Sequence, residues 1–307
     1  MDSNLQDERD DQIDLSIIFK IVWDRKIVIS FLTSVAGIIS VLYALSIPNI
    51  YQSKVVLSPS TSSESNNINI SGTAGALARV AGIDLGSGSD KGPNITLAIE
   101  KITSRKFVTD FITRNSFEPE LIASKDWDAA KNSIIYNNDT YDSLSDSLNY
   151  QPRDIDLYKG YMNRIGVFFD KRTKFTHITF NHYSPYFAKE VLDMIVNTIN
   201  EDIKNQEVKT ATESIKYLEN QIAKTNVSDL KFIFSKLIEK NIKTILLAEV
   251  NPEFVFTVLD PAYVPDIRSS PSRGLICILI TSFSFLFIMM FFIVMDYFRL
   301  IRINNKE

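Results

Sequence analysis

Few side chains in this sequence combine in a way that could support catalysis. The acidic pairs Asp126 with Asp128 and Asp154 with Asp156 could in principle supply the acid and base that cleave a glycosidic bond. Both pairs are more simply interpreted as solvated helix starts, because carboxylates favour the positive end of a helix dipole. No nucleophile is arranged with a base, so we expect a protein that is not an enzyme and has no catalytic residues.

The supply of metal ligands is equally small, since the chain has two histidines and one cysteine. His177 and His182 lie an odd number of residues apart, so one face of a strand cannot carry both. Zinc needs about three or four ligands, and no nearby set completes a site. Cys277 alone excludes an intrachain disulfide and a multi-cysteine metal site. We therefore expect no metal and no other cofactor.

Positions 58–92 are rich in serine and glycine and predict a long loop, interrupted by a small helix at Gly75–Ala81. A glycine-rich loop can hold a phosphate, but GxxxxGK[ST] occurs nowhere in the chain. The sequence therefore gives no basis for an ATPase or kinase module.

The composition excludes further classes of protein. Of the 307 residues, 45% are hydrophobic and 23% are charged, which is not the profile of a disordered chain. The 33 Lys and Arg residues do not outnumber the 37 Asp and Glu residues, which argues against a general nucleic-acid binder. Much of the apolar content lies in two blocks near the ends.

These two blocks, Ile27–Ile47 and Leu275–Met295, contain no charged residue. As a helix each would be roughly 30 Å long, the thickness of a bilayer core. A buried core helix rarely runs uncharged for so long. Ala44–Ser46 resembles a signal-peptide cleavage site, but the leader before it is acidic and the apolar run is too long. We expect two transmembrane helices.

Basic residues beside the spans predict their orientation. Lys20, Arg25 and Lys26 precede the first span, whereas only Lys54 follows it closely. The second span has Arg268 and Arg273 before it and Arg299, Arg302 and Lys306 after it. The first span usually dominates, so we expect both termini in the cytoplasm.

The expected domain layout follows from the spans. It comprises a cytoplasmic stub at 1–26, a transmembrane helix at 27–47, an α/β base domain at 48–184, a helical hairpin arm at 185–249, a last base strand with a proline-rich connector at 250–274, a second transmembrane helix at 275–295 and a second cytoplasmic stub at 296–307. Leu15, Ile18, Phe19 and Val22 share one helical face, which either lies on the inner leaflet or extends the first span.

Hydrophobic patterning predicts the elements of the base domain. Strands are expected at Ile50–Leu57, Ile165–Phe169, Phe175–Phe180 and Phe254–Leu259, and helices at Asn94–Asn115, Asp126–Ile135 and Asp154–Asn163.

The longest predicted element starts at Pro185 and runs to about Lys224 without an internal proline or glycine, roughly 60 Å of helix. Its second half has heptad spacing at Val208, Ala211, Ile215, Leu218 and Ile222. A returning helix about half as long would leave part of this rod without an intrachain partner. The simplest use of the uncovered seam is another protomer, and the alternative is a helix that bends back onto the base.

Three prolines follow the last predicted strand: Pro261, Pro265 and Pro271. They predict a stiff, extended connector that holds the second span at a defined distance and orientation. The alternative is a linker that merely stops a helix.

The order of these parts, together with four stretches of sequence, resembles the bacterial polysaccharide co-polymerases, also called chain-length determinant proteins. The stretches are Asp11–Leu15, Asn181–Ala188, Leu247–Phe256 and Asp260–Pro265. The resemblance extends over about Ile13 to Arg273 and the second span. Two departures stand out: Gly274 only marks the start of that span and no proline lies inside it, and no cytoplasmic kinase domain is present. The first weakens the transfer of polymerase contacts, and the second argues against the tyrosine-kinase branch.

The resemblance implies an α+β membrane protein, in which two transmembrane helices flank a periplasmic α/β base domain with a long projecting helical hairpin. The strands near Tyr51, Ile165, Phe175 and Phe254 would form the base sheet. It also implies a multi-pass protein of the bacterial inner membrane, whose family forms homo-oligomer rings and has no known catalytic residues.

The expected function is non-enzymatic: to set the modal chain length of a surface polysaccharide, often the O-antigen of lipopolysaccharide, together with a membrane polymerase. The growing glycan is a further possible partner, and nucleic acid is not. Val208, Ile215, Leu218 and Ile222 are expected to pack between protomers, and Pro261, Pro265 and Pro271 to orient the second span. The alternative function is a periplasmic adaptor of a polysaccharide export complex.

Overall fold

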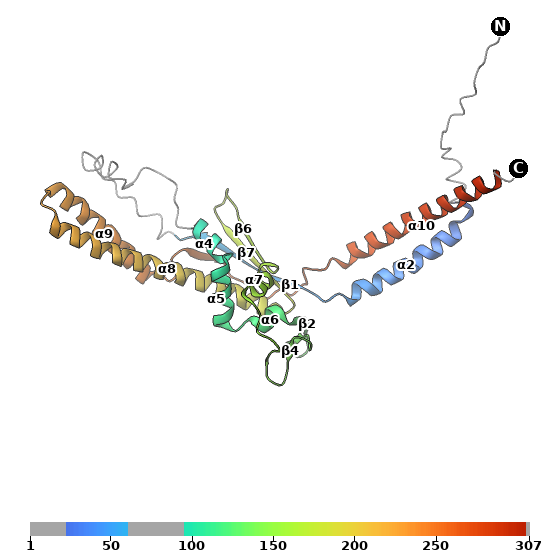
Figure 1. Cartoon of the computed structure of the whole chain (residues 1–307), viewed down its shortest axis with the longest axis horizontal. Coiled ribbons are helices and arrows are strands. Elements are labelled where there is room, and N and C mark those ends of the chain that lie inside the picture. Colours follow the sequence, from blue (N-terminus) through green and yellow to red (C-terminus); the bar gives the residue numbers. More distant parts are fainter. Residues whose placement is uncertain (1–22, 61–94, 305–307) are drawn as a thin grey trace, which may run out of the picture. The chain divides into compact units, whose positions relative to one another are not determined.

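The computed structural model describes residues 23–60 and 95–304, and it divides into two compact units (Figure 1). One unit is Met1–Pro48 with Ser270–Glu307, and the other is Asn49–Ser269. The helical face expected at positions 15–22, the serine- and glycine-rich loop and the small helix at Gly75–Ala81 lie outside the described residues, apart from the first positions of that loop.

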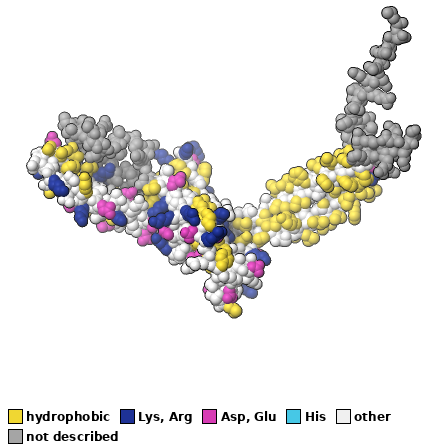
Figure 2. Space-filling model, viewed as in Figure 1, with side chains coloured by type: hydrophobic (Ala, Val, Ile, Leu, Met, Phe, Trp, Pro, Cys, Tyr) yellow, Lys and Arg dark blue, Asp and Glu magenta, His cyan; other side chains and the backbone are white. Residues whose placement is uncertain are grey.

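The first unit is a pair of antiparallel helices, α2 (Lys26–Ser46) and α10 (Arg273–Asn304). Stretches of both are long and apolar enough to cross a membrane, with mean hydropathies of 2.2 for Lys26–Ser46 and 2.7 for Arg273–Asp296. Their side chains are hydrophobic over most of the exposed surface in Figure 2, whereas Asn49–Ser269 carries dispersed acidic and basic side chains. The two apolar helices predicted from the sequence are therefore confirmed.

The second unit is built on a four-stranded antiparallel sheet in the order β6-β7-β1-β8. Its strands are β1 (Tyr51–Pro59), β6 (Ile165–Phe169), β7 (Thr176–His182) and β8 (Phe256–Asp260). These are the four segments that the resemblance placed in one sheet. The hairpin of β6 and β7 follows its predicted bounds to within a few residues.

Shorter elements surround this sheet, and two long helices extend from it. The short helices are α4 (Ile95–Ile102), α5 (Arg105–Asn115), α6 (Glu118–Ile122) and α7 (Asp154–Met162), and the short strands are β2 (Ser124–Asp128), β3 (Ser133–Tyr136), β4 (Tyr141–Asp142) and β5 (Ser147–Leu148). The long helices are α8 (Pro185–Lys224) and α9 (Ser228–Val250), which lie side by side (Figure 1).

The helix predicted at Asp126–Ile135 is wrong, because this stretch forms the β2–β3 hairpin. The Asp128 carboxylate accepts hydrogen bonds from the backbone N–H groups of Ala130 and Lys131, and Asn132 has a φ of 49°. Both residues favour a turn over a helix, since their short polar side chains bond to the local backbone and tolerate the left-handed region.

The helix predicted at Asn94–Asn115 is two helices. It breaks between Ile102 and Arg105, where the Ser104 hydroxyl accepts a hydrogen bond from the N–H of Phe107 at 3.4 Å and so caps α5. A serine in this position offers the backbone a local partner and starts a new helix at little cost.

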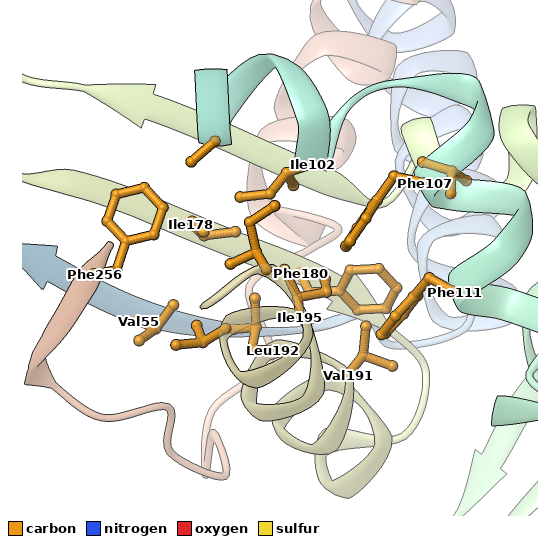
Figure 3. Close-up of a cluster of buried hydrophobic side chains, with 14 of the residues drawn as sticks. Val55, Ile102, Phe107, Phe111, Ile178, Phe180, Val191, Leu192, Ile195 and Phe256 are labelled. Carbon is orange, nitrogen blue, oxygen red and sulfur yellow. The ribbon is translucent and has the colours of Figure 1, made fainter. Parts of the chain in front are cut away.

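The main core lies between the sheet and the first half of α8 (Figure 3). Burial alternates along β7, so that Ile178 and Phe180 face the core beside Val55 of β1. Leu192 and Ile195 of α8 pack against this face, and α4 and α5 add Ile102 and Phe111. Each such side chain contributes roughly 1.5–3 kcal/mol when buried, which fixes the base of α8 firmly on the sheet.

Helix α8 has intrachain partners along its length. The prediction that part of this helix has no intrachain partner is therefore wrong. Its first half packs on β1, β7 and α4, and its second half packs against α9. Although α9 is shorter than α8, the whole of α8 is covered, because the sheet packs on the first half, which α9 does not reach. As predicted, α9 returns to the base, where Ala248 joins the core and the Asn251 amide donates to the Ser60 hydroxyl at 3.2 Å.

Candidate functional site

The start of the long helix is fixed by a capping network. The Ser184 hydroxyl accepts from the N–H of Phe187 at 3.3 Å, and Pro185 occupies the first turn, where its missing N–H costs nothing. The N–H of Ser184 donates to Nδ1 of His182 at 3.1 Å. Nε2 therefore carries the proton and donates to the carbonyl of Glu120, 3.0 Å away.

His182 is buried, and this burial lowers the pKa of its imidazole to about 4. The ring is therefore neutral near pH 7, as its role as acceptor at Nδ1 requires. It joins three elements, namely α6, the end of β7 and the start of α8. This histidine supports the structure, since both of its ring nitrogens are hydrogen-bonded to the backbone.

A buried asparagine ties the middle of α8 to the last strand. The Asn200 amide donates to the carbonyl of Phe256 at 2.9 Å, and its oxygen accepts from the N–H groups of Val255 and Phe256 at 3.0 and 2.9 Å. Sequence analysis did not single out this asparagine, because an asparagine on a long polar helix usually faces solvent. The available signal was its spacing, four positions after Val196 and three before Ile203, which places it on the apolar face.

The four residues expected to pack between protomers lie on the side of α8 that meets α9. Leu218 is buried within the hairpin, near Leu237 and Asn241 of α9. Val208, Ile215 and Ile222 are half-buried. Part of this seam is thus occupied inside one protomer, and its role between protomers stays a prediction.

Helix α9 carries a second, exposed apolar face in addition to the one that packs on α8. Phe232, Ile242, Leu246 and Val250 are 56%, 45%, 55% and 83% exposed, and their spacing places them on one side of the helix. We call this set the outer face of α9. Its signal was the surplus of apolar residues in α9, which is more than one buried stripe requires. Exposed apolar residues in such a row mark an interaction surface.

The connector after β8 is held against the chain that enters the base. The Ser53 hydroxyl donates to the carbonyl of Tyr263 at 2.7 Å, and the N–H of Ser269 donates to the carbonyl of Ile50 at 2.9 Å. Pro265 is buried, Pro261 is exposed and Pro271 is half-buried. These contacts restrict the connector beyond the stiffness of its prolines, and whether it orients the second span stays a prediction.

Within the helix pair, one ion pair joins the start of α2 to α10. The Arg25 guanidinium makes two hydrogen bonds to the Asp296 carboxylate, at 2.8 and 3.1 Å, and stacks over the Phe292 ring at 5.1 Å. Near the other end, the Cys277 thiol lies 3.8 Å from the carbonyl of Ser40. Both contacts fix the register of the two helices.

The acidic pairs singled out from the sequence are not brought together into a constellation. Asp126 and Asp128 lie in β2, while Asp154 and Asp156 do start a helix, α7. The Arg153 guanidinium bonds to the Asp156 carboxylate and lowers its pKa. Over residues 23–60 and 95–304, no group of three or more His, Cys, Asp and Glu residues could hold a metal ion.

Comparisons with known proteins agree with the resemblance. Residues 11–114 match the model of a family described as Wzz, chain length determinant protein, which confirms the resemblance to this family. A search of the curated proteins found no match.

Solved structures also match. A full-length bacterial polysaccharide co-polymerase is 10% identical, with a TM-score of 0.39, and the alignment covers 94% of this chain and 98% of that one. A fragment of WzzB, a polysaccharide co-polymerase from Salmonella Typhimurium, is 12% identical, with a TM-score of 0.27, and the alignment covers 72% of this chain and 100% of the fragment.

Proposed function

From the family match over residues 11–114, we propose that this chain is a non-enzymatic regulator that sets the modal chain length of a surface polysaccharide. The family match is the observation that carries the proposal. The polysaccharide we propose is the O-antigen of lipopolysaccharide. The protein would act with a membrane polymerase and change the probability that a chain of a given length is extended further.

We place the protein in the bacterial inner membrane, with α2 and α10 as the spans. The length and apolar surface of both helices support this placement. Lys20, Arg25 and Lys26 before the first span favour both termini in the cytoplasm and residues 48–274 in the periplasm.

The protein would act as a homo-oligomer whose helical hairpins pack side by side. The exposed outer face of α9 supports such packing, because an apolar row of this kind is expensive to leave in water. Val208, Ile215 and Ile222, which are half-buried against α9, would meet the neighbouring protomer. Leu218 would act from within, by holding α8 and α9 together.

The connector would restrict the position and direction of the second span relative to the base. Pro261, Pro265 and Pro271 limit its backbone freedom, and the bond between Ser269 and Ile50 anchors it to the start of β1. In this proposal the direction in which α10 leaves the base determines how it meets the polymerase.

The test is co-purification from the native membrane, combined with deletion of the protein. A length regulator should retain a polysaccharide polymerase, and its deletion should leave the polysaccharide on the surface with its length distribution changed. Retention of an ATP-binding transporter, with loss of surface polysaccharide on deletion, would overturn the proposal in favour of an export adaptor.

Oligomer size is the second readout. Phe232→Glu with Leu246→Glu should reduce the mass of the detergent-solubilised oligomer, because charge would enter an apolar contact. The matched control is Lys231→Glu with Lys243→Glu, which places the same two glutamates at exposed positions that border the outer face and already carry a charge. Equal masses for both double variants would contradict the packing proposed here.

A further inference from the structure

Three aromatic side chains from distant parts of the chain meet beside the junction of β7 and α8. Tyr51 begins β1, Trp127 lies in β2 and Tyr186 is in the first turn of α8. The rings of Tyr51 and Trp127 meet edge to face, with centroids 5.6 Å apart. Those of Trp127 and Tyr186 are 6.3 Å apart and inclined by 51°. We call these three residues the aromatic platform.

The aromatic platform is separate from the hydrophobic core. None of its three residues belongs to the cluster of buried side chains around the sheet, or to the half-buried ones packed against that cluster. Tyr186 is 51% exposed, and Tyr51 and Trp127 are half-buried. Rings used only for packing would be expected to lie deeper, since aromatic side chains gain most when fully buried.

The indole N–H of Trp127 is an unsatisfied donor. The nitrogen is buried, and it has no hydrogen-bond partner among the described residues. A buried donor without an acceptor is costly, and an indole N–H can only donate. A ligand that brings an oxygen to this edge, with a small movement of a neighbouring ring, would satisfy it.

The surroundings hold the platform in place. The Arg164 guanidinium donates to the carbonyl of Leu121 at 2.7 Å and to the hydroxyl of Ser124, the first residue of β2, at 3.1 Å. Together with the bond from His182 to the carbonyl of Glu120, this fixes the chain that leads from α6 into β2. The position of Trp127 is therefore set by buried contacts rather than by a loose hairpin.

Two lysines are close in sequence to residues of the aromatic platform. Lys125 is exposed and precedes Trp127 by two residues, at the irregularity in the pairing of β2 with β3. Lys189 follows Tyr186 by about one helical turn, is paired with Asp193 and is partly exposed. The surface thus combines aromatic faces with polar groups able to bond to oxygen.

We propose that the aromatic platform of Tyr51, Trp127 and Tyr186 binds a sugar chain, namely the polysaccharide whose length the protein regulates. This inference rests on the proposed function. A pyranose ring presents weakly polarised C–H bonds on its faces, which pack on the negative face of an aromatic ring. Its hydroxyls lie at the rim, where the Trp127 N–H can donate a hydrogen bond to them.

The chemistry of the patch favours a sugar over an apolar partner. A lipid tail or an apolar helix calls for a continuous apolar surface, which the flanking charged side chains interrupt. A sugar chain needs alternating apolar and hydrogen-bonding contacts, and aromatic side chains with a polar edge provide both at a small entropic cost. Because Tyr186 lies at the start of the long helix, binding of a sugar chain to the platform would also contact the helical hairpin arm.

The test uses the intrinsic fluorescence of the full-length protein in detergent. The chain has two tryptophans, so Trp23→Phe leaves Trp127 as the sole reporter. The probe is the surface polysaccharide of the host, released by mild acid and separated by size. We expect a saturable change in Trp127 emission, and no change in the Trp127→Phe protein, which keeps only Trp23.

Tyr186→Ala in the Trp23→Phe background should weaken binding about tenfold, as expected when a central aromatic contact is removed. Tyr217→Ala is the matched control, because Tyr217 is 63% exposed on the same helix, far from the platform, and should leave binding unchanged. If Tyr186→Ala fails to fold, Tyr186→Leu keeps the apolar volume and removes the aromatic face, and it should show the same loss.

Absence of a saturable signal, or equal effects of the substitutions at Tyr186 and Tyr217, would overturn the proposal. A change in oligomer mass on substitution of Tyr186 would also overturn it, by assigning the platform to a contact between protomers. The failure is distinguishable from failure of the proposed function: length control that persists in cells without any binding of polysaccharide to the protein would reject the platform alone.

Discussion

At the residue scale, His182 links the stability of the base to pH. Burial lowers its folded-state pKa to about 4, whereas the unfolded chain has a value near 6.5. The unfolded state therefore binds the proton more readily between these values, and stability is lost as the pH falls through this window. The loss approaches roughly 3 kcal/mol near pH 4.

We expect His182→Gln to flatten the dependence of stability on pH between about pH 6.5 and pH 4. Glutamine retains a donor and an acceptor but does not titrate. Thermal unfolding of the full chain across this range measures the effect. His177→Gln is the control and should keep the steep dependence, because His182 is still present. An equally steep curve for His182→Gln would show that another group titrates. Burial raises the pKa of Glu120, which acts with the opposite sign and is present in both variants.

Asn200 is the residue on which the contact between α8 and β8 depends. Asn200→Leu would leave the backbone N–H groups of Val255 and Phe256 and the carbonyl of Phe256 without their side-chain partner in a buried place. We expect a loss of about 2–4 kcal/mol in unfolding free energy, measured by denaturant unfolding. Asn205→Leu, at an exposed position of the same helix, should cost less than about 0.5 kcal/mol. Similar losses for the two variants would contradict this account.

At the element scale, the sequence predicts those helices and strands whose ends are determined by neighbouring residues. The long helix from Pro185 to Lys224 was predicted to its ends, because Ser184 and Pro185 start a helix and nothing interrupts it. The β2–β3 hairpin was missed, since its turn depends on Asp128 and Asn132 while Ala129 and Ala130 favour a helix.

Local sequence patterns do not predict which distant elements pack against each other. The heptad spacing of α8 correctly marked an apolar seam, but it could not tell whether α9, the sheet or another protomer covers it. The aromatic platform could not be predicted from the sequence for the same reason. Tyr51, Trp127 and Tyr186 are far apart in sequence, and each alone looks like an ordinary aromatic residue.

The pairing of α2 with α10 can be tested by a cross-link. Because the Cys277 thiol lies 3.8 Å from the carbonyl of Ser40, Ser40→Cys should form a disulfide with Cys277 on mild oxidation. The product should be an intrachain cross-link, seen on non-reducing gels after cleavage in the base. Ile39→Cys, at an exposed neighbouring position, should not form it. A disulfide-linked dimer in place of the intrachain product would show that the pair forms between protomers.

At the scale of the whole molecule, the proposed function rests on the resemblance to a family and not on a cluster of catalytic or ligand-binding residues. The family match covers residues 11–114, while the long arm, the outer face of α9 and the connector lie beyond it. Within the described residues no metal-binding group is present, and no acidic pair is built into a site. The proposed roles lie on surfaces: we propose that apolar faces serve assembly and that the aromatic platform binds the glycan.

The most direct test of length regulation is the polysaccharide ladder on a gel. A host lacking the protein should show a broad ladder without a modal cluster, and complementation with the wild-type chain should restore the cluster. Complementation with Phe232→Glu and Leu246→Glu together should leave the ladder broad, whereas the control with Lys231→Glu and Lys243→Glu should restore it. A ladder that is unchanged on deletion, or a complete loss of surface polysaccharide, would contradict the claim that this protein sets chain length.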